Sequence, residues 1–306
     1  MTAIVGVLNS QGVAIAADSA VTVTGNNGKK VFNRSNKIFT LSKYHPVGIA
    51  IYSNADFLGI PLETLVKLYR SKIKDTPYKT LNEYKLDFII FLKSKVNLIS
   101  REYKRDAFYN FCSEAFKTVK DNIIRTLDGM TAQLAALQEA DAIAQIDAAT
   151  TNEMDGYLAM VDGLSKATYV DISTQDFSAY YTNEIAEISS FVQGEIQKLH
   201  PLLTFKSNHI SKFTDIFHSL ANLEFIFEQH SGLVFIGFGD DEIFPSSQLV
   251  LLGTLIADNP RIRIFEKIAI EPGKSNSNIL PYVQGDVTTA VLTGVDPNYK
   301  AEAMKL

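Results

Sequence analysis

Residues 1–22 read MTAIVGVLNSQGVAIAADSAVT and predict how the fold begins. Two short apolar runs, 3–8 and 13–17, flank the polar stretch NSQG at 9–12. Apolar runs on either side of Asn, Ser and Gly are typical of a β-hairpin. The apolar runs of the first sixty residues, which include 37–42 and 47–52, are almost continuous, so we expect both faces of these strands to be covered. Thr2 stands at the head of the first run and Asp18 at the end of the second.

Composition narrows the class of protein. The chain has 306 residues, of which 46% are hydrophobic and 21% charged, an ordinary globular balance. Its net charge of −5 argues against nucleic acid or an anionic membrane surface as the main partner. No apolar run reaches the roughly 18 residues that a membrane span needs, and no signal peptide is recognisable. We therefore expect a cytoplasmic protein. Its single cysteine, Cys112, excludes an internal disulfide and is expected to pack in a helix.

The chain changes from strands to helices and back to strands. Further strands are predicted at 20–24, 37–42, 47–52, 232–239, 248–257, 261–270 and 278–283. Helices are predicted at 56–73, 80–98, through most of 100–222, and at 287–293, with a capping box at Thr80–Glu83. This order favours an α+β fold over alternating βαβ units. We expect 1–98 and 223–306 to form the core and 99–222 to be a helical insertion, with an antiparallel helical hairpin within 127–165.

Thr2 is a candidate nucleophile. A threonine hydroxyl reacts only when a base removes its proton, and the α-amine of an N-terminal threonine can be that base. Removal of Met1 would expose this amine. The site would also need a cation, a carboxylate to hold it and an oxyanion donor, for which Lys37, Asp18 and Ser53 with Asn54 are candidates at strand ends. The plainer interpretations are a turn cap for Asp18 and a solvated edge residue for Lys37.

Two stretches carry a family resemblance: TAIVGVLNSQGVAIAADSAVT at 2–22 and NKIFTLSKYHPVGIAIYSNADF at 36–57. They resemble the N-terminal part of proteasome β-subunits and their bacterial relatives, which are N-terminal-nucleophile (Ntn) hydrolases. LVFIGFGDDE at 233–242 and YVQGDVTTAVL at 282–292 are more weakly similar to later family segments. The resemblance implies a four-layer αββα sandwich and assembly into homo-oligomers. It assigns Thr2 as nucleophile, Asp18 as acidic partner, Lys37 as the lysine and Ser53 as the oxyanion donor.

The chain departs from the family pattern at several positions. Ser53 replaces the usual glycine, and a one-residue shift would move the donor role to Tyr52. Gln284 stands where the family places a helper serine, and the nearby Asp286 could substitute for it or cap a helix. The longer loop before Lys37 holds rival cations: Lys29, Lys30 and Arg34.

These observations predict a threonine-type amidohydrolase, with a peptide as the expected substrate and with no cofactor or metal. Two alternatives stay open: an Ntn hydrolase acting on a small amide, and a non-catalytic proteasome-like assembly or binding protein. Retention of Met1, or a Lys37 that points away from Thr2, would favour the non-catalytic protein.

Other motifs are weaker. The stretch GFGDDE at 237–242 could bind a divalent cation through its carboxylates, but a turn between strands is the favoured interpretation. The five histidines show no metal-ligand spacing. No G-x-S-x-G elbow, GxGxxG or P-loop motif occurs, so serine-hydrolase and nucleotide-binding functions have no support in the sequence.

Overall fold

The computed structural model describes residues 3–25, 28–32, 36–167, 170–198, 200, 202–203, 206–271, 273–283 and 285–297. The chain divides into two compact units. One contains Met1–Leu98, His230–Leu252 and Ile264–Leu306, and the other contains Ile99–Gln229 and Gly253–Arg263. In the described part of the chain, no helix combines the length and the apolar character needed to cross a membrane.

The predicted N-terminal hairpin is confirmed. Strands β1 (Ile4–Asn9) and β2 (Gly12–Ala17) pair antiparallel, from Ile4 opposite Ala17 to Asn9 opposite Gly12. The Asn9 side chain accepts the N–H groups of Gln11 and Gly12 and so closes the turn. Strand β13 (Ser277–Val283) pairs with the other edge of β1, which gives a three-stranded sheet in the order β13-β1-β2.

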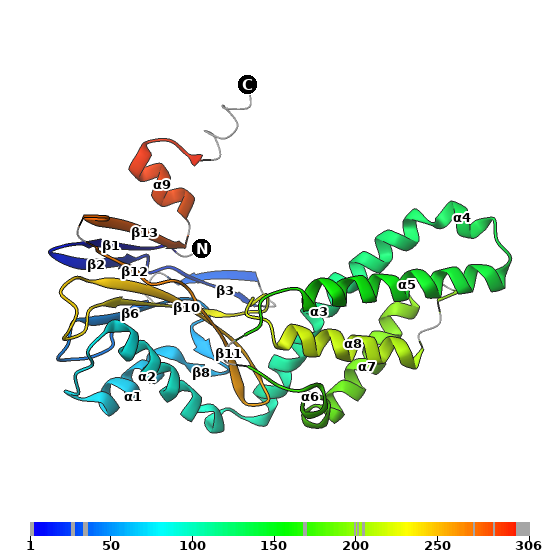
Figure 1. The fold of residues 1–306 in the computed structure, drawn as a ribbon, viewed down its shortest axis with the longest axis horizontal. Helices are drawn as coiled ribbons and strands as arrows, with labels where there is room; N and C mark the ends of the chain where they lie inside the picture. Colours follow the sequence, from blue (N-terminus) through cyan, green and yellow to red (C-terminus); the bar gives the residue numbers. More distant parts are fainter. Residues whose placement is uncertain are drawn as a thin grey trace. The chain divides into compact units, whose positions relative to one another are not determined.

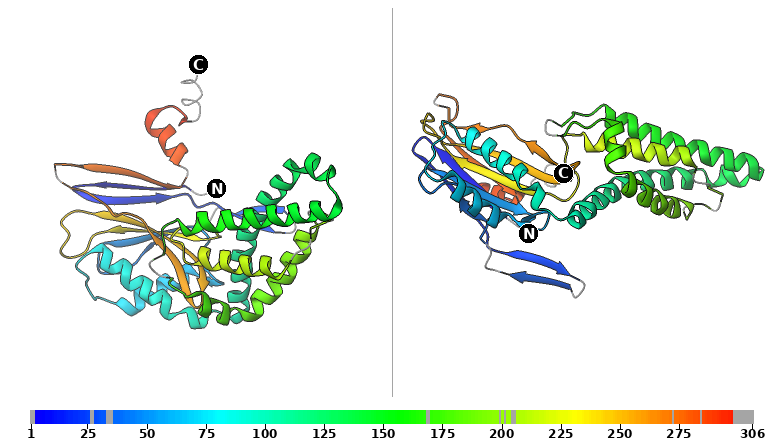
Figure 2. Two further views of the ribbon diagram at one scale, coloured as in Figure 1. Left: turned by 45° about the vertical axis from the view of Figure 1, so that its right-hand side comes forward. Right: turned by 90° about the horizontal axis from the view of Figure 1, so that it is seen from below.

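A second, larger sheet has the order β11-β10-β9-β6-β5, with β12 also paired to β10. Its strands are β5 (Ile38–Thr40), β6 (Val47–Ser53), β9 (Ser231–Gly237), β10 (Ser246–Ile256), β11 (Asn259–Ile264) and β12 (Ile268–Ala269). The single strand expected at 261–270 is thus divided between β11 and β12. Two small hairpins form separate sheets: β3 (Val21–Gly25) with β4 (Gly28–Phe32), which is the blue hairpin in the right-hand view of Figure 2, and β7 (Asp56–Phe57) with β8 (Ile60–Pro61).

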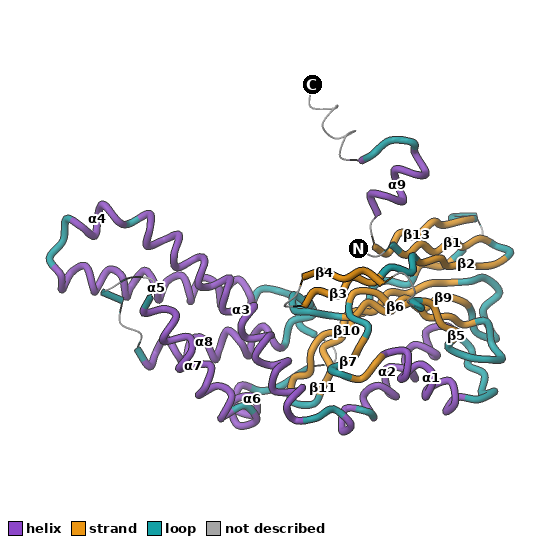
Figure 3. The backbone as a smooth tube through the Cα atoms, turned by 180° about the vertical axis from the view of Figure 1, so that it is seen from behind, coloured by secondary structure: helices purple, strands orange, loops and turns teal. Residues whose placement is uncertain are grey.

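Buried apolar side chains of the first unit pack between these two sheets. Ile4 of β1 packs with Ala50 of β6 and Val234 of β9, and Leu8 packs with Ile236. Helices α1 (Leu62–Ile73) and α2 (Leu81–Ser94) cover the other face of the larger sheet (Figures 1 and 3). Helix α2 contacts β9 there.

The expectation that both faces of the early strands are covered agrees with the mostly buried β6 but is wrong for β1 and β2. The β1 side chains alternate between buried and more exposed positions, and Val7 is 41% exposed. The register places Val7 opposite Ala14 on β2 and Ile279 on β13, both also exposed. An apolar run shows that both faces of a strand carry apolar side chains. It does not show whether another layer covers each face. Helix α9 (Gly285–Thr293) follows β13 after one residue, and none of its residues is buried.

The start of α2 follows the predicted capping chemistry. Thr80 Oγ1 accepts the N–H of Glu83 at 3.2 Å, and the Glu83 carboxylate accepts the N–H of Lys79 at 2.8 Å. Glu242, from the turn after β9, adds a third cap by accepting the N–H of Leu81 at 2.7 Å. The Glu242 bond joins the start of α2 to the turn that follows β9 of the larger sheet.

The second unit is mainly helical, as predicted. Its helices are α3 (Arg101–Gly129), α4 (Thr131–Ala135), α5 (Glu139–Asp162), α6 (Thr174–Tyr180), α7 (Thr182–Gln197) and α8 (Ser207–Ala221). Helices α3 and α5 run back along each other after the short α4, so a helical hairpin is present, but its first arm is α3 at 101–129 and not a helix within 127–165 (Figure 1). Cys112 on α3 is buried, and burial raises the pKa of its thiol.

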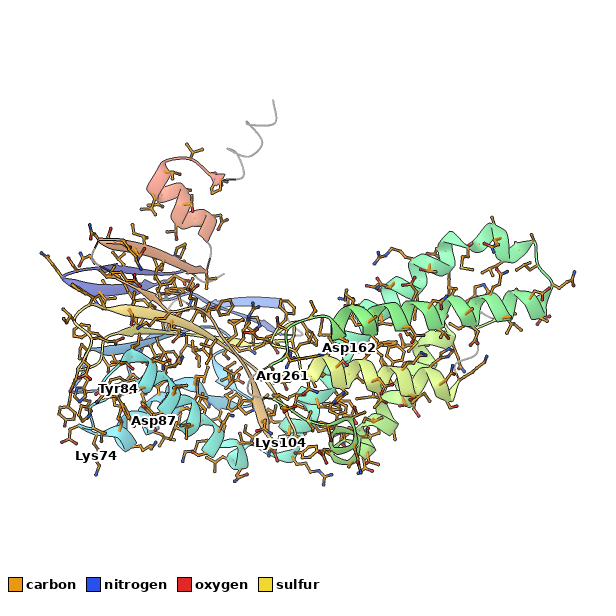
Figure 4. The ribbon with its side chains drawn as sticks, viewed as in Figure 1. Lys74, Tyr84, Asp87, Lys104, Asp162 and Arg261 are labelled. Atoms are coloured by element: carbon orange, nitrogen blue, oxygen red, sulfur yellow. The ribbon has the colours of Figure 1, made fainter. Side chains whose placement is uncertain are left out.

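This unit also contains 223–229 and 253–263, which we expected in the sheet core. Arg261 of β11, which is labelled in Figure 4, connects these two segments and is 1% exposed. Its guanidinium binds the Glu228 carboxylate at 2.6 Å and the carbonyl oxygens of Leu223 and Phe225 at 3.0 and 2.7 Å. These bonds tie the tip of the β10–β11 hairpin to the segment after α8.

Candidate active site

Asp18 closes the open end of the β1–β2 hairpin. Its Oδ1 accepts the Ala3 N–H at 2.8 Å, and its own N–H donates to the Ala3 carbonyl at 3.1 Å. Its Oδ2 accepts the N–H of Ala20 at 3.2 Å. Both backbone polar groups of Ala3 are therefore bonded to one residue. Asp18 is more than a turn cap, because its carboxylate also holds a cation.

That cation is Lys37. Its Nζ lies 2.8 Å from Asp18 Oδ1 and donates to the Ala20 carbonyl at 2.7 Å. The side chain is only 7% exposed, which excludes a solvated edge role. The Lys37 carbonyl accepts the N–H of Ile51 at 2.8 Å and so anchors the start of β5 to β6. The side chains of the rival cations Lys29 and Lys30, and all of Arg34, lie outside the described part of the chain.

The environment of Asp18 favours its charged form. Burial alone would raise the pKa of this carboxyl, but the hydrogen bond from Lys37, the Ala3 and Ala20 N–H groups and the Lys37 charge outweigh it. The pKa of Asp18 is therefore lowered from its ordinary value of 3.8. Asp18 is therefore held in its charged form at neutral pH.

Thr2, the predicted nucleophile, lies outside the described residues, as do Met1 and Gln284. Ala3, the next residue after Thr2, is the group that Asp18 binds. The structure thus brings together two of the four predicted site residues, Asp18 and Lys37. Their contact lies beside Ala3, the residue that follows Thr2 in the sequence.

Ser53, the fourth, ends β6 and pairs with Ser231 on β9. Its φ of 65° lies in the left-handed region, which non-glycine residues rarely adopt. A glycine at this position would be free of that strain. The backbone conformation therefore gives a physical reason why glycine would suit the place where this chain has serine. Ser53 is two residues from Ile51, the partner of Lys37 on the neighbouring strand.

Tyr52 has a role in packing that the sequence did not predict. Its side chain belongs to the cluster of Ile4, Ala50 and Val234 between the two sheets. Gly232, directly opposite on β9, leaves space for the phenol ring: a Cβ there would lie 2.0 Å from the nearest ring atom. Burial raises the pKa of Tyr52. The feature of the sequence that could have indicated this packing is Gly232, because a glycine at the start of an apolar strand often marks a close approach of another group.

The stretch 237–242 is a turn between β9 and β10, the favoured interpretation. The Glu242 carboxylate is engaged by the N–H groups of Leu81 and Gly239 and by the Lys267 ammonium. Asp240 and Asp241 donate their backbone N–H groups to the carbonyls of 78 and 79. Among the described residues, no group of three or more His, Cys, Asp or Glu side chains is placed to hold a metal ion.

Comparison of the chain with protein-family models, with curated proteins and with solved structures finds no match. The functional argument therefore depends on the contacts of Asp18 and Lys37 and on the sequence resemblance of 2–22 and 36–57.

Proposed function

We propose that this protein is a threonine-type Ntn amidohydrolase that acts on peptides. The observation that carries the proposal is the shared Oδ1 atom of Asp18, which binds the Lys37 ammonium and the Ala3 N–H at 2.8 Å each. Activation of an N-terminal threonine requires a cation and a carboxylate that holds it, and here that carboxylate also binds the N–H of Ala3, the residue that follows Thr2.

In the proposed reaction, removal of Met1 frees the α-amine of Thr2. The amine takes the proton from Thr2 Oγ as the oxygen attacks the substrate carbonyl, and then passes it to the leaving amine. Water hydrolyses the resulting ester in a second step with the same amine as base. Lys37 lowers the pKa of the reacting groups by its charge, Asp18 orients Lys37, and the Ser53 N–H stabilises the oxyanion.

The architecture supports this proposal in part. Two facing antiparallel sheets with α1 and α2 on one side are compatible with three layers of an αββα sandwich. In the full proposed fold, α9 belongs to the fourth layer and 99–222 is a helical insertion. The open apolar face of β13-β1-β2 is where that layer would lie. Homo-oligomerisation is part of the same proposal.

The test is an intact-mass measurement before and after treatment with a peptide epoxyketone, a reagent that joins both the amine and the hydroxyl of an N-terminal threonine. We expect loss of Met1 and one adduct, which disappears in Thr2→Ala and persists in the turn variant Ser10→Ala. Peptide hydrolysis should be lost in Thr2→Ala as well.

Quantitative retention of Met1 would overturn the mechanism and favour the non-catalytic binding protein. If Met1 is absent and no adduct forms, a panel of small amides is the next substrate set. Turnover that depends on Thr2 would then identify an Ntn hydrolase of small amides. An exposed Thr2 that reacts with neither class would contradict an enzymatic function.

A further inference from the structure

His209 is a titratable residue that the proposed threonine chemistry does not use. It lies in the first turn of α8, and its side chain is 0% exposed. Histidine gains and loses a proton close to neutral pH, so a buried histidine can convert a small change of pH into a change of structure. What this histidine does depends on the contacts of its two ring nitrogens.

The first nitrogen caps the start of α8. His209 Nδ1 accepts the N–H of Lys206 at 3.2 Å, while the Lys206 carbonyl accepts the N–H of His209 at 3.1 Å. A side chain that reaches back to the N–H three residues earlier is half of a capping box, where Glu or Gln usually fills this role. The bond requires an unprotonated Nδ1, because only the lone pair of that nitrogen can accept a hydrogen bond.

The second nitrogen faces α5. Since Nδ1 is the acceptor, the neutral ring carries its proton on Nε2. Nε2 lies 3.3 Å from Thr151 Oγ1 and 3.4 Å from Asp147 Oδ1, both on α5. Helices α5 and α8 pack along each other (Figure 1). The neutral ring of His209 therefore joins the first turn of α8 to α5.

Three charges act on this ring: Asp147 from α5, and Lys206 and Lys212 from α8 itself. Among the described residues, α3, α6 and α7, which also pack against α8, contribute no charge that shifts the pKa of His209. The Asp147 carboxylate is already bound by the Lys206 ammonium at 2.8 Å. Burial lowers the pKa of His209, the Asp147 charge opposes this, and the two lysines add to the effect of burial. The pKa therefore lies below its ordinary value of 6.5.

A second proton on the ring would change the cap. It would occupy Nδ1, so that an N–H of the ring would face the N–H of Lys206, and the hydrogen bond between them would be lost. The imidazolium would also be held away from water beside two lysine charges. Opening of the first turn relieves both effects, because it separates the two donors and lets water reach the ring. A fall in pH therefore favours the open form.

We propose that His209 is a pH-sensitive latch. While its imidazole is neutral, His209 holds the first turn of α8 against α5. When the imidazole takes up a proton in mildly acidic solution, that turn opens. The latch is independent of the proposed hydrolase activity and of Thr2.

Hydrogen–deuterium exchange of the whole protein, followed by mass spectrometry of its peptides, tests the latch at about pH 7.5 and about pH 5.5. Protection factors correct for the pH dependence of the exchange reaction itself. In the peptide that covers the start of α8 they should fall about fivefold at the lower pH, as expected for loss of one capping hydrogen bond. Peptides of α1, in the other unit, should keep their protection.

His209→Gln removes the titration but keeps an acceptor, because glutamine fills this position in capping boxes. We expect the variant to protect the start of α8 equally at both pH values. His218→Gln, which changes a half-buried histidine on the same helix, is the matched control and should respond as the wild type does. In wild-type protein labelled with ¹⁵N-histidine, NMR should show the Nε2–H tautomer of His209 at the higher pH, and protonation of the ring should accompany the loss of protection.

Four results would overturn the proposal. The first is an imidazolium at His209 at the higher pH. The second is a wild-type protein whose α8 peptide keeps its protection at the lower pH, or loses it together with the α1 peptides in general acid unfolding. The third is an equal fall in protection in His209→Gln. The fourth, which needs no variant, is a midpoint of ring protonation more than about one pH unit from that of the exchange change.

Discussion

The Lys37 ammonium and the Asp18 carboxylate lie 2.8 Å apart, and the lysine side chain is only 7% exposed. The same carboxylate oxygen holds the Ala3 N–H. Asp18 therefore couples the position of a buried cation to the backbone next to Thr2. We therefore predict separate effects of substitutions in this pair on activity and on stability.

Lys37→Met should abolish most of the proposed hydrolysis while the protein remains folded. Loss of the cation removes its stabilisation of the reacting groups, and we expect kcat to fall about 10²-fold or more. Asp18 is 32% exposed and keeps two backbone N–H donors, so the free energy of unfolding should change by only about 1 kcal/mol. Lys72→Met, which removes an exposed lysine paired with Asp87, is the control. Unchanged turnover in Lys37→Met would remove Lys37 from the mechanism.

The lowered pKa of Asp18 predicts how stability depends on pH. A carboxyl whose pKa is lower in the folded state stabilises the fold above its unfolded pKa. That contribution is lost as pH falls through the folded value, which lies below 3.8. The stability difference between wild type and Asp18→Asn should therefore be largest near neutral pH and shrink below about pH 4. Urea unfolding at several pH values measures it, and a difference that stays constant down to pH 3 would contradict the assignment.

Gly232→Ala should destabilise the sheet pair. The new Cβ would lie within 2.1 Å of two atoms of the Tyr52 ring, so the ring or the strand must move. Overpacking of this kind costs about 1–3 kcal/mol of unfolding free energy. Tyr52→Ala should relieve the clash, so Gly232→Ala should cost less in that background. Gly12→Ala, where a Cβ meets nothing within 4 Å, is the matched control. Equal costs in both backgrounds would mean that Tyr52 does not cause the effect.

Ser53→Gly should stabilise the protein by about 0.5–1 kcal/mol, because glycine adopts a φ of 65° without steric strain. The backbone N–H proposed as oxyanion donor remains, so hydrolysis should be retained. Ser53→Pro removes that N–H but cannot adopt the observed φ, so it does not separate the two effects. Ser10→Gly, at a residue with negative φ, should slightly destabilise the protein and so serves as the control in denaturant unfolding. A loss of stability in Ser53→Gly would show that the hydroxyl makes a compensating contact.

The parts of the fold that the sequence predicted are local. The β1–β2 hairpin follows from Asn9 and its neighbours, which close the turn by themselves, and the start of α2 follows from Thr80 and Glu83. Strand β4 was missed because Lys29 and Lys30 interrupt its apolar pattern. The pairing of β6 with β9 joins segments almost 180 residues apart, and no local pattern specifies it.

In the candidate site, too, the sequence predicted local features but not the contacts between distant segments. The positions of Asp18 and Lys37 at strand ends suggested a pair, and the structure places their charged atoms in contact. The Ala20 carbonyl, which accepts a second hydrogen bond from the Lys37 ammonium, belongs to the backbone, so no residue type in the sequence indicates its role. The packing of Tyr52 over Gly232 likewise appears only when the two strands are aligned.

Arg261→Met should strongly destabilise the helical unit. The substitution leaves the Glu228 carboxylate, which is 4% exposed, without its guanidinium partner. It also removes the donors to the Leu223 and Phe225 carbonyls. Removing one member of a buried ion pair costs about 3–5 kcal/mol because the other charge stays desolvated. Thermal and urea unfolding measure the change, and Arg263→Met on the same strand, at a half-buried arginine, is the control.

Glu228→Gln in the Arg261→Met background should recover part of the lost stability. The amide carries no charge to desolvate, and its oxygen can still accept the Thr254 N–H that Glu228 Oε1 accepts at 3.3 Å. The sign of this coupling distinguishes two explanations. If the double variant is more stable than Arg261→Met alone, the uncompensated charge causes the loss. If it is less stable, the cost of Arg261→Met comes from the lost donors and the contacts of the guanidinium with the rings of Phe111 and Phe227.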